Sequence, residues 1–310
     1  MSVLVFGSLN MDLVTRVPRL PAPGETLMGT TFFTTAGGKG ANQAVAAAKL
    51  GATTHMIGRV GNDAWGESLI QGLRAVGVET AGIAIEPDLH TGVAVITVAE
   101  SGENQIIGVY GANDRLDATD IQRLQTQLPQ AKVLLLQLEV SVDAVRQAAQ
   151  VAKQAGVVVI LDPAPVREES IVDLYPNIDF LIPNEVEASQ LVGFTVHNPE
   201  TAAKAAKVFH QQGIPSAIIK LGAQGALYST PIVSGEPSTK WFPAFSVEAI
   251  DAVAAGDAFA GGLAVALSEG RSIEEAIRWG CAAGAIATTR VGAQVAMGDR
   301  TELEALLANS

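Results

Sequence analysis

Short, nearly continuous apolar runs alternate with longer helical patterns along most of this 310-residue chain. Apolar runs without polar alternation are typical of strands that are buried on both faces of a parallel sheet. The predicted strands are Val3–Phe6, Thr54–Ile57, Val133–Gln137, Val157–Leu161, Phe180–Ile182 and Ala217–Leu221. The predicted helices are Gly40–Leu50, Ala64–Val76, Ala118–Leu128, Val142–Ala155, Pro199–Gln212, Ala254–Ser268 and Ile273–Thr289. Repeated strand–helix units predict an α/β fold, with a Rossmann-like, doubly wound, mostly parallel sheet flanked by helices.

Two segments interrupt this rhythm with β-rich sequence. The first contains Thr30–Thr35 after a Pro/Gly-rich stretch, and the second places Gly92–Ala99 and Gln105–Tyr110 around a polar turn, as in a hairpin. Because a few strands cannot bury a face alone, we expect a small β-sheet lid over the open end of the core, with its spare face free to form a homodimer. The expected division is a nucleotide- and sugar-binding core of residues 1–12, 36–88 and 113–310 and a lid of residues 13–35 and 89–112.

The charge balance of the chain limits the kinds of molecule that this protein can be expected to bind. The chain has 20 basic and 32 acidic side chains, a formal net charge of −12, which argues against binding to nucleic acid or to an anionic membrane surface. A single cysteine excludes an internal disulfide. The first residues lack a basic stretch before an apolar run, and no apolar, uncharged stretch reaches the roughly 20 residues of a membrane span. We therefore expect a cytoplasmic protein.

Five of the predicted strands end with or are followed by polar residues. These residues are Asn10 and Asp12, Glu139, Asp162, Asn184 and Glu187, and Lys220. The carboxyl ends of parallel strands meet at one edge of the sheet, where open α/β proteins bind their ligands, so we expect a site at this edge. Asp and Asn also favour strand ends and helix caps, and unrelated caps and turns are the alternative.

A glycine-rich stretch, Gly37–Gln43, opens the helix that continues to Leu50. Glycines permit close backbone approach, and a helix start offers free N–H groups to a polar ligand. The stretch is not a P-loop, because Gly40 follows Lys39 where Ser or Thr should stand. It does not fit the dinucleotide-binding spacing either, because Gln43 occupies the place of the third glycine. By itself it is weak evidence, and a simple turn requirement is the alternative.

A stronger motif precedes the predicted helix at Ala254–Ser268. The small residues Ala254, Ala255 and Gly256 leave backbone N–H groups unobstructed at a helix start, where they stabilise negative charge on a transferring group. Asp257 then falls in the first turn, where the helix dipole and the amides are expected to keep it ionised. An ionised carboxylate there can accept a proton from a substrate hydroxyl as its oxygen attacks phosphorus. The alternative is an acidic residue that only stabilises the helix start.

These motifs resemble, in content and order, those of the ribokinase-like (PfkB) family of carbohydrate kinases. Gly37–Ala44 is similar to the family's first signature and Asp251–Asp257 to its second. Shorter matches are Gly7–Asp12, Pro23–Thr26, Gly111–Asn113, Pro183–Glu185 and Thr289–Ala293. The resemblance covers essentially the whole chain and implies ATP-dependent phosphorylation of the primary hydroxyl of a pentose, with D-ribose as the expected substrate. The alternatives are another substrate of the family, such as fructose, deoxyribose, adenosine or a sugar acid, or a non-catalytic sugar-binding module.

The resemblance also implies roles for individual residues. Asp257 matches the general base, and Ala254, Ala255 and Gly256 match the anion hole for the γ-phosphate. The positions that match sugar contacts are Asn10, Asp12, Gly38, Lys39, Asn42, Glu139 and Asp257. Those that match nucleotide contacts are Asn184, Glu187, Lys220, Gly222, Gly225 and Gly256. Glu187 is implied to organise Mg²⁺ through water, although Asn184 and Glu187 also have the spacing of a helix capping box.

A monovalent-cation site, for K⁺ as activator, is implied beside the anion hole. The matching positions are Asp251, Val253, Ala287, Arg290, Gly292 and Ala296. The chain departs from the family pattern here, because Ala252 and Val253 replace two threonines and Ala296 stands where serine is frequent. Val253 still offers a backbone carbonyl, whereas Ala296 offers no side-chain ligand.

Overall fold

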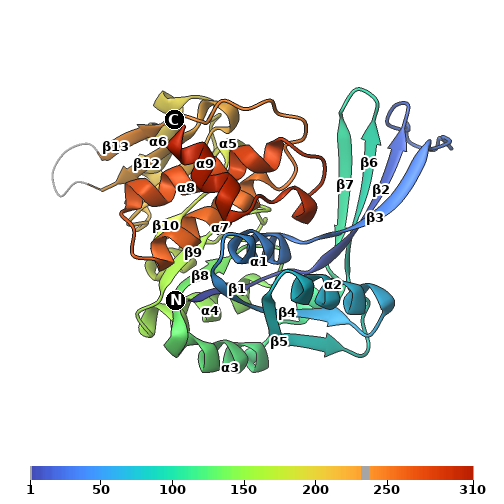
Figure 1. The fold of residues 1–310 in the computed structure, drawn as a ribbon, viewed down its shortest axis with the longest axis horizontal. Coiled ribbons are helices and arrows are strands. Elements are labelled where there is room, and N and C mark those ends of the chain that lie inside the picture. The colour runs from blue at the N-terminus through green and yellow to red at the C-terminus, as the bar shows by residue number, and fades with distance from the viewer. Residues whose placement is uncertain (1, 232–236, 310) are drawn as a thin grey trace.

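The computed structural model describes residues 2–231 and 237–309, so Met1, 232–236 and Ser310 of the expected core lie outside the described residues. One large sheet forms the centre of the molecule (Figure 1). Its strands are β1 Ser2–Phe6, β4 Thr53–Gly61, β5 Val78–Glu86, β8 Ala131–Leu136, β9 Val158–Leu161, β10 Phe180–Leu181, β11 Ala217–Lys220, β12 Ala226–Thr230 and β13 Ser238–Phe242. Their order is β13-β12-β11-β10-β9-β8-β1-β4-β5, parallel from β5 to β11 and antiparallel from there to β13. The predicted doubly wound, mostly parallel sheet is confirmed.

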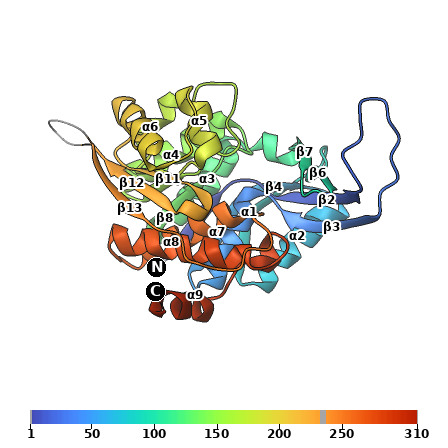
Figure 2. The same cartoon turned by 90° about the horizontal axis from the view of Figure 1, so that it is seen from above.

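Helices cover both faces of this sheet (Figure 2). They are α1 Lys39–Lys49, α2 Ala64–Ala75, α3 Ala118–Gln127, α4 Val142–Gln154, α5 Glu185–Val192, α6 Pro199–Gln211, α7 Ala255–Ser268, α8 Ile273–Thr288 and α9 Arg300–Ala308. One hydrophobic cluster lies between the sheet and α1, α2, α7, α8 and α9, and a second between the sheet and α3, α4, α5 and α6. Along β1, Val3 and Val5 enter the first cluster and Leu4 and Phe6 the second. Because successive side chains of a strand point to opposite faces, an uninterrupted apolar run is what a sheet covered on both sides requires.

The connections contain short 3₁₀ turns. These are η1 Gly111–Arg115, η2 Leu128–Gln130, η3 Val172–Asn177, η4 Gly222–Gln224 and η5 Gln294–Ala296. Among the helices that the structure describes, none combines the length and the apolar character needed to cross a membrane.

A second, smaller sheet projects from one side of the core (Figure 1). Its strands are β2 Asn10–Val17, β3 Thr31–Gly37, β6 Gly92–Ala99 and β7 Asn104–Val109, in the order β3-β2-β6-β7. β6 and β7 form the predicted hairpin, and β2 pairs in parallel with β6. β2 begins at Asn10 and β3 ends at Gly37, so both strands start or finish at the carboxyl edge of the large sheet.

Candidate active site

Helix α1 begins against the turn that leads from β1 into β2. Gly38 is the N-cap of α1 with φ at 88°, and a Cβ on it would lie 2.6 Å from the backbone nitrogen of Asn10. A Cβ on Gly40 would lie 2.6 Å from the backbone nitrogen of Ser8. The glycines of the predicted motif therefore allow the chain to approach its own backbone closely. This approach brings the first turn of α1, with Lys39 and Asn42, to the edge where the strands end.

Glu139 gathers the groups at one end of the site. Its Oε2 accepts hydrogen bonds from Ser8 Oγ at 2.5 Å, from Asn10 Nδ2 at 3.2 Å and from the Lys39 backbone N–H at 3.0 Å. Asn113 fixes the orientation of Asn10, because Asn113 Nδ2 donates to Asn10 Oδ1 at 2.8 Å. The predicted residues Asn10, Lys39 and Glu139 are thus brought together, and we call this group, with Asp12, the sugar end.

Asp12 lies in β2 over the end of β3. A Cβ on Gly37 would stand 2.3 Å from Asp12 Oδ2, so the carboxylate occupies the space that a side chain on β3 would fill. Burial raises the pKa of Asp12 to about 7, and the nearby negative charges of Glu139 and Asp257 add to this shift. A carboxyl that is this reluctant to ionise in the free protein gains from hydroxyl or cationic groups that bind to it.

Lys39 is surrounded by acidic side chains. Burial by itself lowers the pKa of Lys39, but Asp257, Asp162, Glu139 and Glu187 together raise it above its ordinary value. The ammonium group is therefore charged at neutral pH, and it lies near enough to Glu139 at the sugar end and to Asp162, Glu187 and Asp257 for all four charges to act on it.

Asp257 lies in the first turn of α7, as predicted from its position in the motif, and its side chain is buried. Its Oδ2 accepts a hydrogen bond from Asn42 Nδ2 at 2.9 Å and its Oδ1 accepts one from Gln43 Nε2 at 3.1 Å. Burial raises the pKa of Asp257 to about 6, against the opposing effects of Lys39 and the two amides. Burial thus outweighs the effects of Lys39 and the two amides, but a carboxyl with this pKa is still mostly ionised at neutral pH. The resulting pKa suits a general base that works near neutrality.

The backbone before Asp257 turns sharply. Ala254 has φ at 58° and ψ at 12° and is the one non-glycine residue with positive φ among the described residues. The Ala255 N–H donates to a carbonyl three residues back at 3.3 Å, whereas the Gly256 and Asp257 N–H groups have no partner within residues 2–231 and 237–309. Lys220 Nζ lies 3.4 Å from where a Cβ on Gly256 would stand. Two free N–H groups and an ammonium group therefore lie close together, and we call this group, with Asp257, the phosphate end, after the role predicted for it.

Lys220 is held by a second buried carboxylate. Its Nζ donates to Asp162 Oδ1 at 3.0 Å, and Asp162 Oδ2 accepts from Gln43 Nε2 at 3.1 Å. Gly222 and Gly225 form the turn between β11 and β12, directly after Lys220. A Cβ on Gly225 would lie 2.0 Å from the Phe242 carbonyl oxygen, so packing against β13 accounts for that glycine independently of any nucleotide.

Asn184 and Glu187 form the capping box that their spacing predicts. Glu187 Oε2 accepts from the Asn184 backbone N–H at 2.8 Å, and Asn184 Oδ1 accepts from the Glu187 N–H at 2.8 Å. Burial and the charge of Asp162 raise the pKa of Glu187, while Lys220 opposes the shift. Glu187 is therefore both the cap of α5 and a carboxylate beside the phosphate end. No group of three or more acidic, His or Cys side chains suited to a metal occurs in the described part of the chain.

The loops of the predicted cation site are joined by Asp251. Its Oδ1 accepts from the Val253 N–H at 3.0 Å and its Oδ2 from the Gly292 N–H at 3.0 Å. The Arg290 side chain pairs with Glu302, which leaves only its carbonyl for a ligand role. The remaining positions are the buried Ala287 and Ala296.

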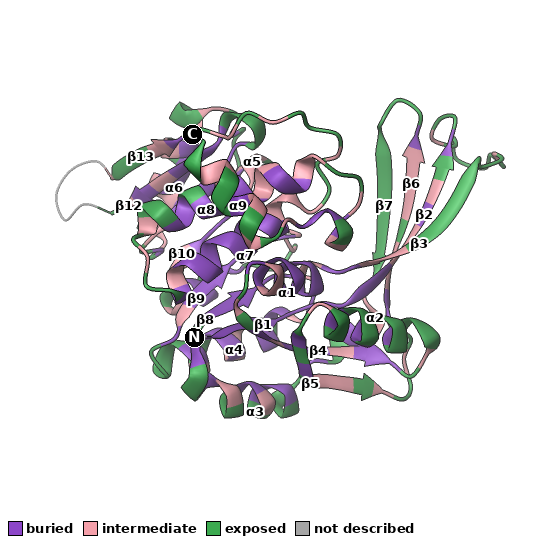
Figure 3. Ribbon diagram, viewed as in Figure 1, coloured by how far each residue is buried: buried purple, intermediate pink, exposed green. Residues whose placement is uncertain are grey.

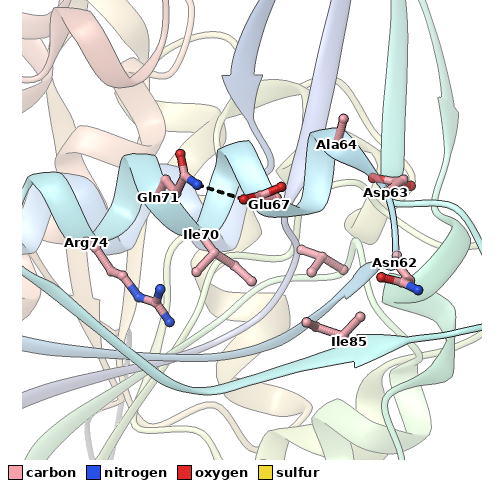
Figure 4. Close-up of a pocket in the computed structure, with 10 residues that line it drawn as sticks. Asn62, Asp63, Ala64, Glu67, Ile70, Gln71, Arg74 and Ile85 are labelled. Carbon is pink, nitrogen blue, oxygen red and sulfur yellow. Dashed lines mark hydrogen bonds between the residues drawn. The ribbon is translucent and has the colours of Figure 1, made fainter.

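A cavity of about 540 Å³ lies elsewhere, between α2 and the ends of β4 and β5 (Figure 4). Asn62, Asp63, Glu67, Arg74 and Ile85 are among the residues that line it. None of the residues predicted to bind sugar, nucleotide or metal lines this cavity. It is separate from the candidate active site.

Several site residues were not predicted as ligands. They are Ser8, Gln43, Asn113, Gln137 and Asp162. Ser8, Gln43 and Asn113 lie inside stretches that match family motifs, and Asp162 follows a predicted strand, so the sequence offered a reason to consider each of them. It offered none for Gln137, which ends an apolar run and whose side chain donates a hydrogen bond to Gln43.

The family model for pfkB carbohydrate kinases matches residues 1–300. This chain belongs to that family. A ribokinase of Haemophilus influenzae is 43% identical over 97% of this chain and 96% of its own length. A deoxyribokinase of Salmonella typhi is 35% identical over 95% of this chain and 94% of its own length. The structure of Arabidopsis thaliana ribokinase in complex with ribose and ATP superimposes with a TM-score of 0.88 at 34% identity, covering 100% of this chain and 99% of that one.

Family membership identifies the chain as a carbohydrate kinase, a phosphotransferase that acts on an alcohol group. It agrees with the geometry, because a buried carboxylate beside free N–H groups and an ammonium is suited to phosphoryl transfer to a hydroxyl. The likeness to solved ribokinases also confirms the fold, a mostly parallel sheet flanked by helices with a separate small sheet.

Proposed function

We propose that this kinase transfers the γ-phosphoryl group of ATP to the primary hydroxyl of D-ribose and forms D-ribose 5-phosphate. The observation that carries the proposal is the phosphate end, where the buried Asp257 carboxylate stands beside the free N–H groups of Gly256 and Asp257 itself. A protein that only binds sugar has no use for a base that faces an anion hole.

The chemistry follows from these groups. Asp257 accepts the proton of the sugar hydroxyl as its oxygen forms a bond to the γ-phosphorus. The bond from that phosphorus to the bridging oxygen breaks, ADP leaves, and the proton remains on the carboxyl. Negative charge on the transferred group is stabilised by the N–H groups and by Lys220. With a pKa of about 6, Asp257 is mostly ionised at neutral pH and can act as the base.

We assign sugar binding to Asn10, Asp12, Gly38, Lys39, Asn42 and Glu139. Asn42 supports this assignment, because its Oδ1 is buried without a hydrogen-bond partner while its Nδ2 holds Asp257. A hydroxyl of the sugar would satisfy that oxygen. The carboxylates of Asp12 and Glu139 suit adjacent hydroxyls, each of which can donate to one oxygen. Deoxyribose is the second candidate substrate, because a deoxyribokinase is among the relatives.

The nucleotide phosphates are assigned to Lys220, Asn184 and Glu187, with Gly222, Gly225 and Gly256 in the backbone around them. Glu187 fits a role toward Mg²⁺, because its carboxylate lies near Lys220 and Asp162 at the phosphate end and carboxylate oxygen is a ligand type that Mg²⁺ prefers. We infer that it acts on the ion through water. Magnesium bound to ATP would neutralise phosphate charge and align the γ-phosphoryl group.

Potassium is proposed as an activator at the loops joined by Asp251. A carboxylate with carbonyls from Val253, Ala287, Arg290 and Gly292 is a suitable set of hard oxygen ligands, and Ala296 contributes none. The loop that Asp251 holds leads directly into the anion hole, so ordering it should help catalysis. The test compares thermal unfolding and turnover in K⁺ with those in a large organic cation, and equal values in both would remove the proposal.

We propose that residues 13–35 and 89–112 act as a lid and as the interface of a homodimer. The small sheet leaves Phe32 65%, Ile106 61% and Ile107 64% exposed. Phe32 and Ile107 lie on one face of the sheet and Ile106 lies on the other, and exposed apolar side chains of this kind are suited to contact with a second copy of the same sheet. Sedimentation of wild type and Ile107→Asp tests this, and a wild-type monomer at micromolar concentration would contradict it. A cytoplasmic location is proposed because ATP is available there, and cell fractionation checks it.

The deciding experiment is ADP release from Mg·ATP with ribose, deoxyribose, fructose or adenosine, with and without potassium. Wild type is compared with Asp257→Asn. A ribose-dependent signal that the variant loses by ~100-fold or more supports the reaction and its base. Stronger turnover of deoxyribose would make that sugar the substrate. Silence with every sugar, while ribose still binds, would favour a binding module.

A further inference from the structure

Gln43 is hydrogen-bonded to the proposed base and is completely buried. Its side-chain amide donates from Nε2 to two carboxylates, Asp257 Oδ1 at 3.1 Å and Asp162 Oδ2 at 3.1 Å. Its Oε1 accepts a hydrogen bond from Gln137 Nε2 at 2.6 Å. Both ends of this amide are thus engaged by other buried side chains.

These contacts allow only one orientation of the amide. An ionised carboxylate can only accept hydrogen bonds, so the NH₂ group of Gln43 must face Asp162 and Asp257. The Gln43 oxygen must then face the NH₂ group of Gln137. The Gln137 oxygen is left buried and unpartnered against Gly7, where a Cβ would lie 2.0 Å from it. An amide pair that leaves one buried oxygen unsatisfied in order to orient the other amide is unusual in a core that packing alone determines.

The contacts of Gln43 connect both halves of the phosphate end. Asp257 is held through Oδ1 by Gln43 and through Oδ2 by Asn42. Asp162 is held through Oδ2 by Gln43 and through Oδ1 by Lys220. The base and the phosphate-facing ammonium are therefore joined through a single amide.

We propose that Gln43 is a positioning residue that couples the base Asp257 to the Asp162–Lys220 pair, so that one side chain sets the direction of both. The inference rests on the proposed function, because it assumes that Asp257 accepts the proton and that Lys220 faces the transferred phosphoryl group. The proposal assigns Gln43 no contact of its own with either substrate.

The charges around Asp257 explain why a neutral double donor is needed there. Asp162 and Asp12 face Asp257 with negative charge, and Lys39 and Lys220 supply positive charge to the same space. Without an N–H group between them, Asp162 and Asp257 would face each other as two buried carboxylates. The amide hydrogen bond also lowers the pKa of Asp257 against the effect of burial.

The test is Gln43→Met, which keeps the length and volume of the side chain and removes both donors. We expect kcat to fall by ~10- to 100-fold, as for a misplaced catalytic group, with the KM values for ribose and ATP changed less than about threefold. In a plot of kcat/KM against pH, the acidic limb should move to higher pH, because that limb reports the pKa of the base in the free enzyme.

Two further variants sharpen the result. Gln43→Glu is nearly isosteric and places a third carboxyl between Asp162 and Asp257, so it should move the acidic limb at least as far. Gln137→Met is a graded comparison: it removes the contact to Gln43 Oε1 but leaves both donors to the carboxylates in place, so it should move the limb less than Gln43→Met does. Ribose binding by calorimetry and thermal unfolding show whether each variant is folded.

The outcomes separate this inference from the proposed function. A wild-type protein that phosphorylates no sugar would overturn the function. A wild-type kinase whose Gln43→Met variant keeps its kcat, or loses kcat without any movement of the acidic limb, would overturn the positioning role and leave Gln43 as a packing residue. If Gln43→Met does not fold, the Gln43→Glu profile decides, and an unmoved limb there overturns the proposal.

Discussion

The two sheets meet at the active site, but they bury their residues very differently (Figure 3). Every residue of β1 is buried, whereas every residue of β7 is exposed. The large sheet is covered by helices on both faces and the small sheet is not. A strand packed on both sides holds the residues at its end rigidly, whereas a strand with an open face depends on what binds to it.

The same difference in burial separates the residues of the site into two groups. The phosphate end comes from core elements: Asp257 from α7, Lys220 from β11 and Asp162 after β9. The sugar end takes Asn10 and Asp12 from β2 of the small sheet. We therefore expect changes at the phosphate end to act on kcat, and changes at the small sheet to act on the KM for the sugar and on stability.

The largest effect is expected at the phosphate end. Asp257→Asn keeps the shape and the contact with Asn42 but cannot accept a proton, so kcat should fall by at least ~100-fold while the KM for ribose changes little. Steady-state kinetics and ribose calorimetry on the same preparations measure the two effects. Near-normal turnover would remove Asp257 from the mechanism and with it the division of the site.

Asp12 should lower stability at neutral pH. Its pKa is raised from 3.8 to about 7 in the folded protein, so the folded state binds more protons than the unfolded state between those values. Stability therefore falls as pH rises through this window. Asp12→Asn should gain about 2 kcal/mol of unfolding free energy above pH 7, roughly half of what such a shift implies at 1.36 kcal/mol per unit.

Denaturant unfolding at pH 4 and pH 8 checks this gain. The difference between Asp12→Asn and wild type should be close to zero at the lower pH and full at the higher one. Saturating ribose should reduce the gain, because the sugar stabilises wild type more than the variant. A pH-independent difference would mean that the carboxyl is not strained in the free protein.

The same residue should control sugar affinity. Asp12→Ala removes a charge-assisted contact, so the KM for ribose should rise about tenfold, with a smaller change in kcat. Thr34→Ala, one register position away and on the other face of the small sheet, is the matched control. If both variants raise the KM equally, the small sheet acts through its stability and not through a contact with the sugar.

The two regions also differ in how far the sequence predicts them. Strands covered on both faces are predicted well, because a short, uninterrupted apolar run between turn residues is typical of a fully buried strand. The strands β5, β12 and β13 lie toward the edges of the large sheet, with partly exposed side chains, and give no such run. Helices α5 and α9 are short, with eight and nine residues, and lack a long periodic pattern.

Within the site, the sequence indicates residue types but not their contacts. Asp257 and Lys39 could be placed by motif, because a base and a glycine-flanked lysine have recognisable neighbours in the chain. Gln43 could not be assigned a role, because its partners Gln137 and Asp257 lie 94 and 214 residues away. The raised pKa of Asp257 could not be predicted for a related reason: burial is a property of packing, and its effect exceeds that of the hydrogen bonds from Asn42 and Gln43.

The smallest expected effect tests whether the rigid phosphate end needs its backbone strain. Ala254 occupies the left-handed region, which costs an L-residue roughly 1–2 kcal/mol and glycine almost nothing. Glycine also raises the conformational entropy of the unfolded chain, which offsets part of this gain. Ala254→Gly should therefore gain no more than about 1 kcal/mol of stability, with kcat within about twofold of wild type. Ala255→Gly is the matched control, and because that residue is already helical it should lose stability by up to about 1 kcal/mol.

Thermal unfolding and kcat of these two variants decide the matter. A stable Ala254→Gly variant with normal turnover would show that the direction of the Gly256 and Asp257 N–H groups is fixed by the packing of α7 against α1 and α8. A stable variant with a large loss of kcat would show that the N–H groups are aimed by the restricted backbone of Ala254 itself. In that case the phosphate end would resemble the small sheet, because the positions of its N–H groups would depend on the local backbone and not on the helices that pack around α7.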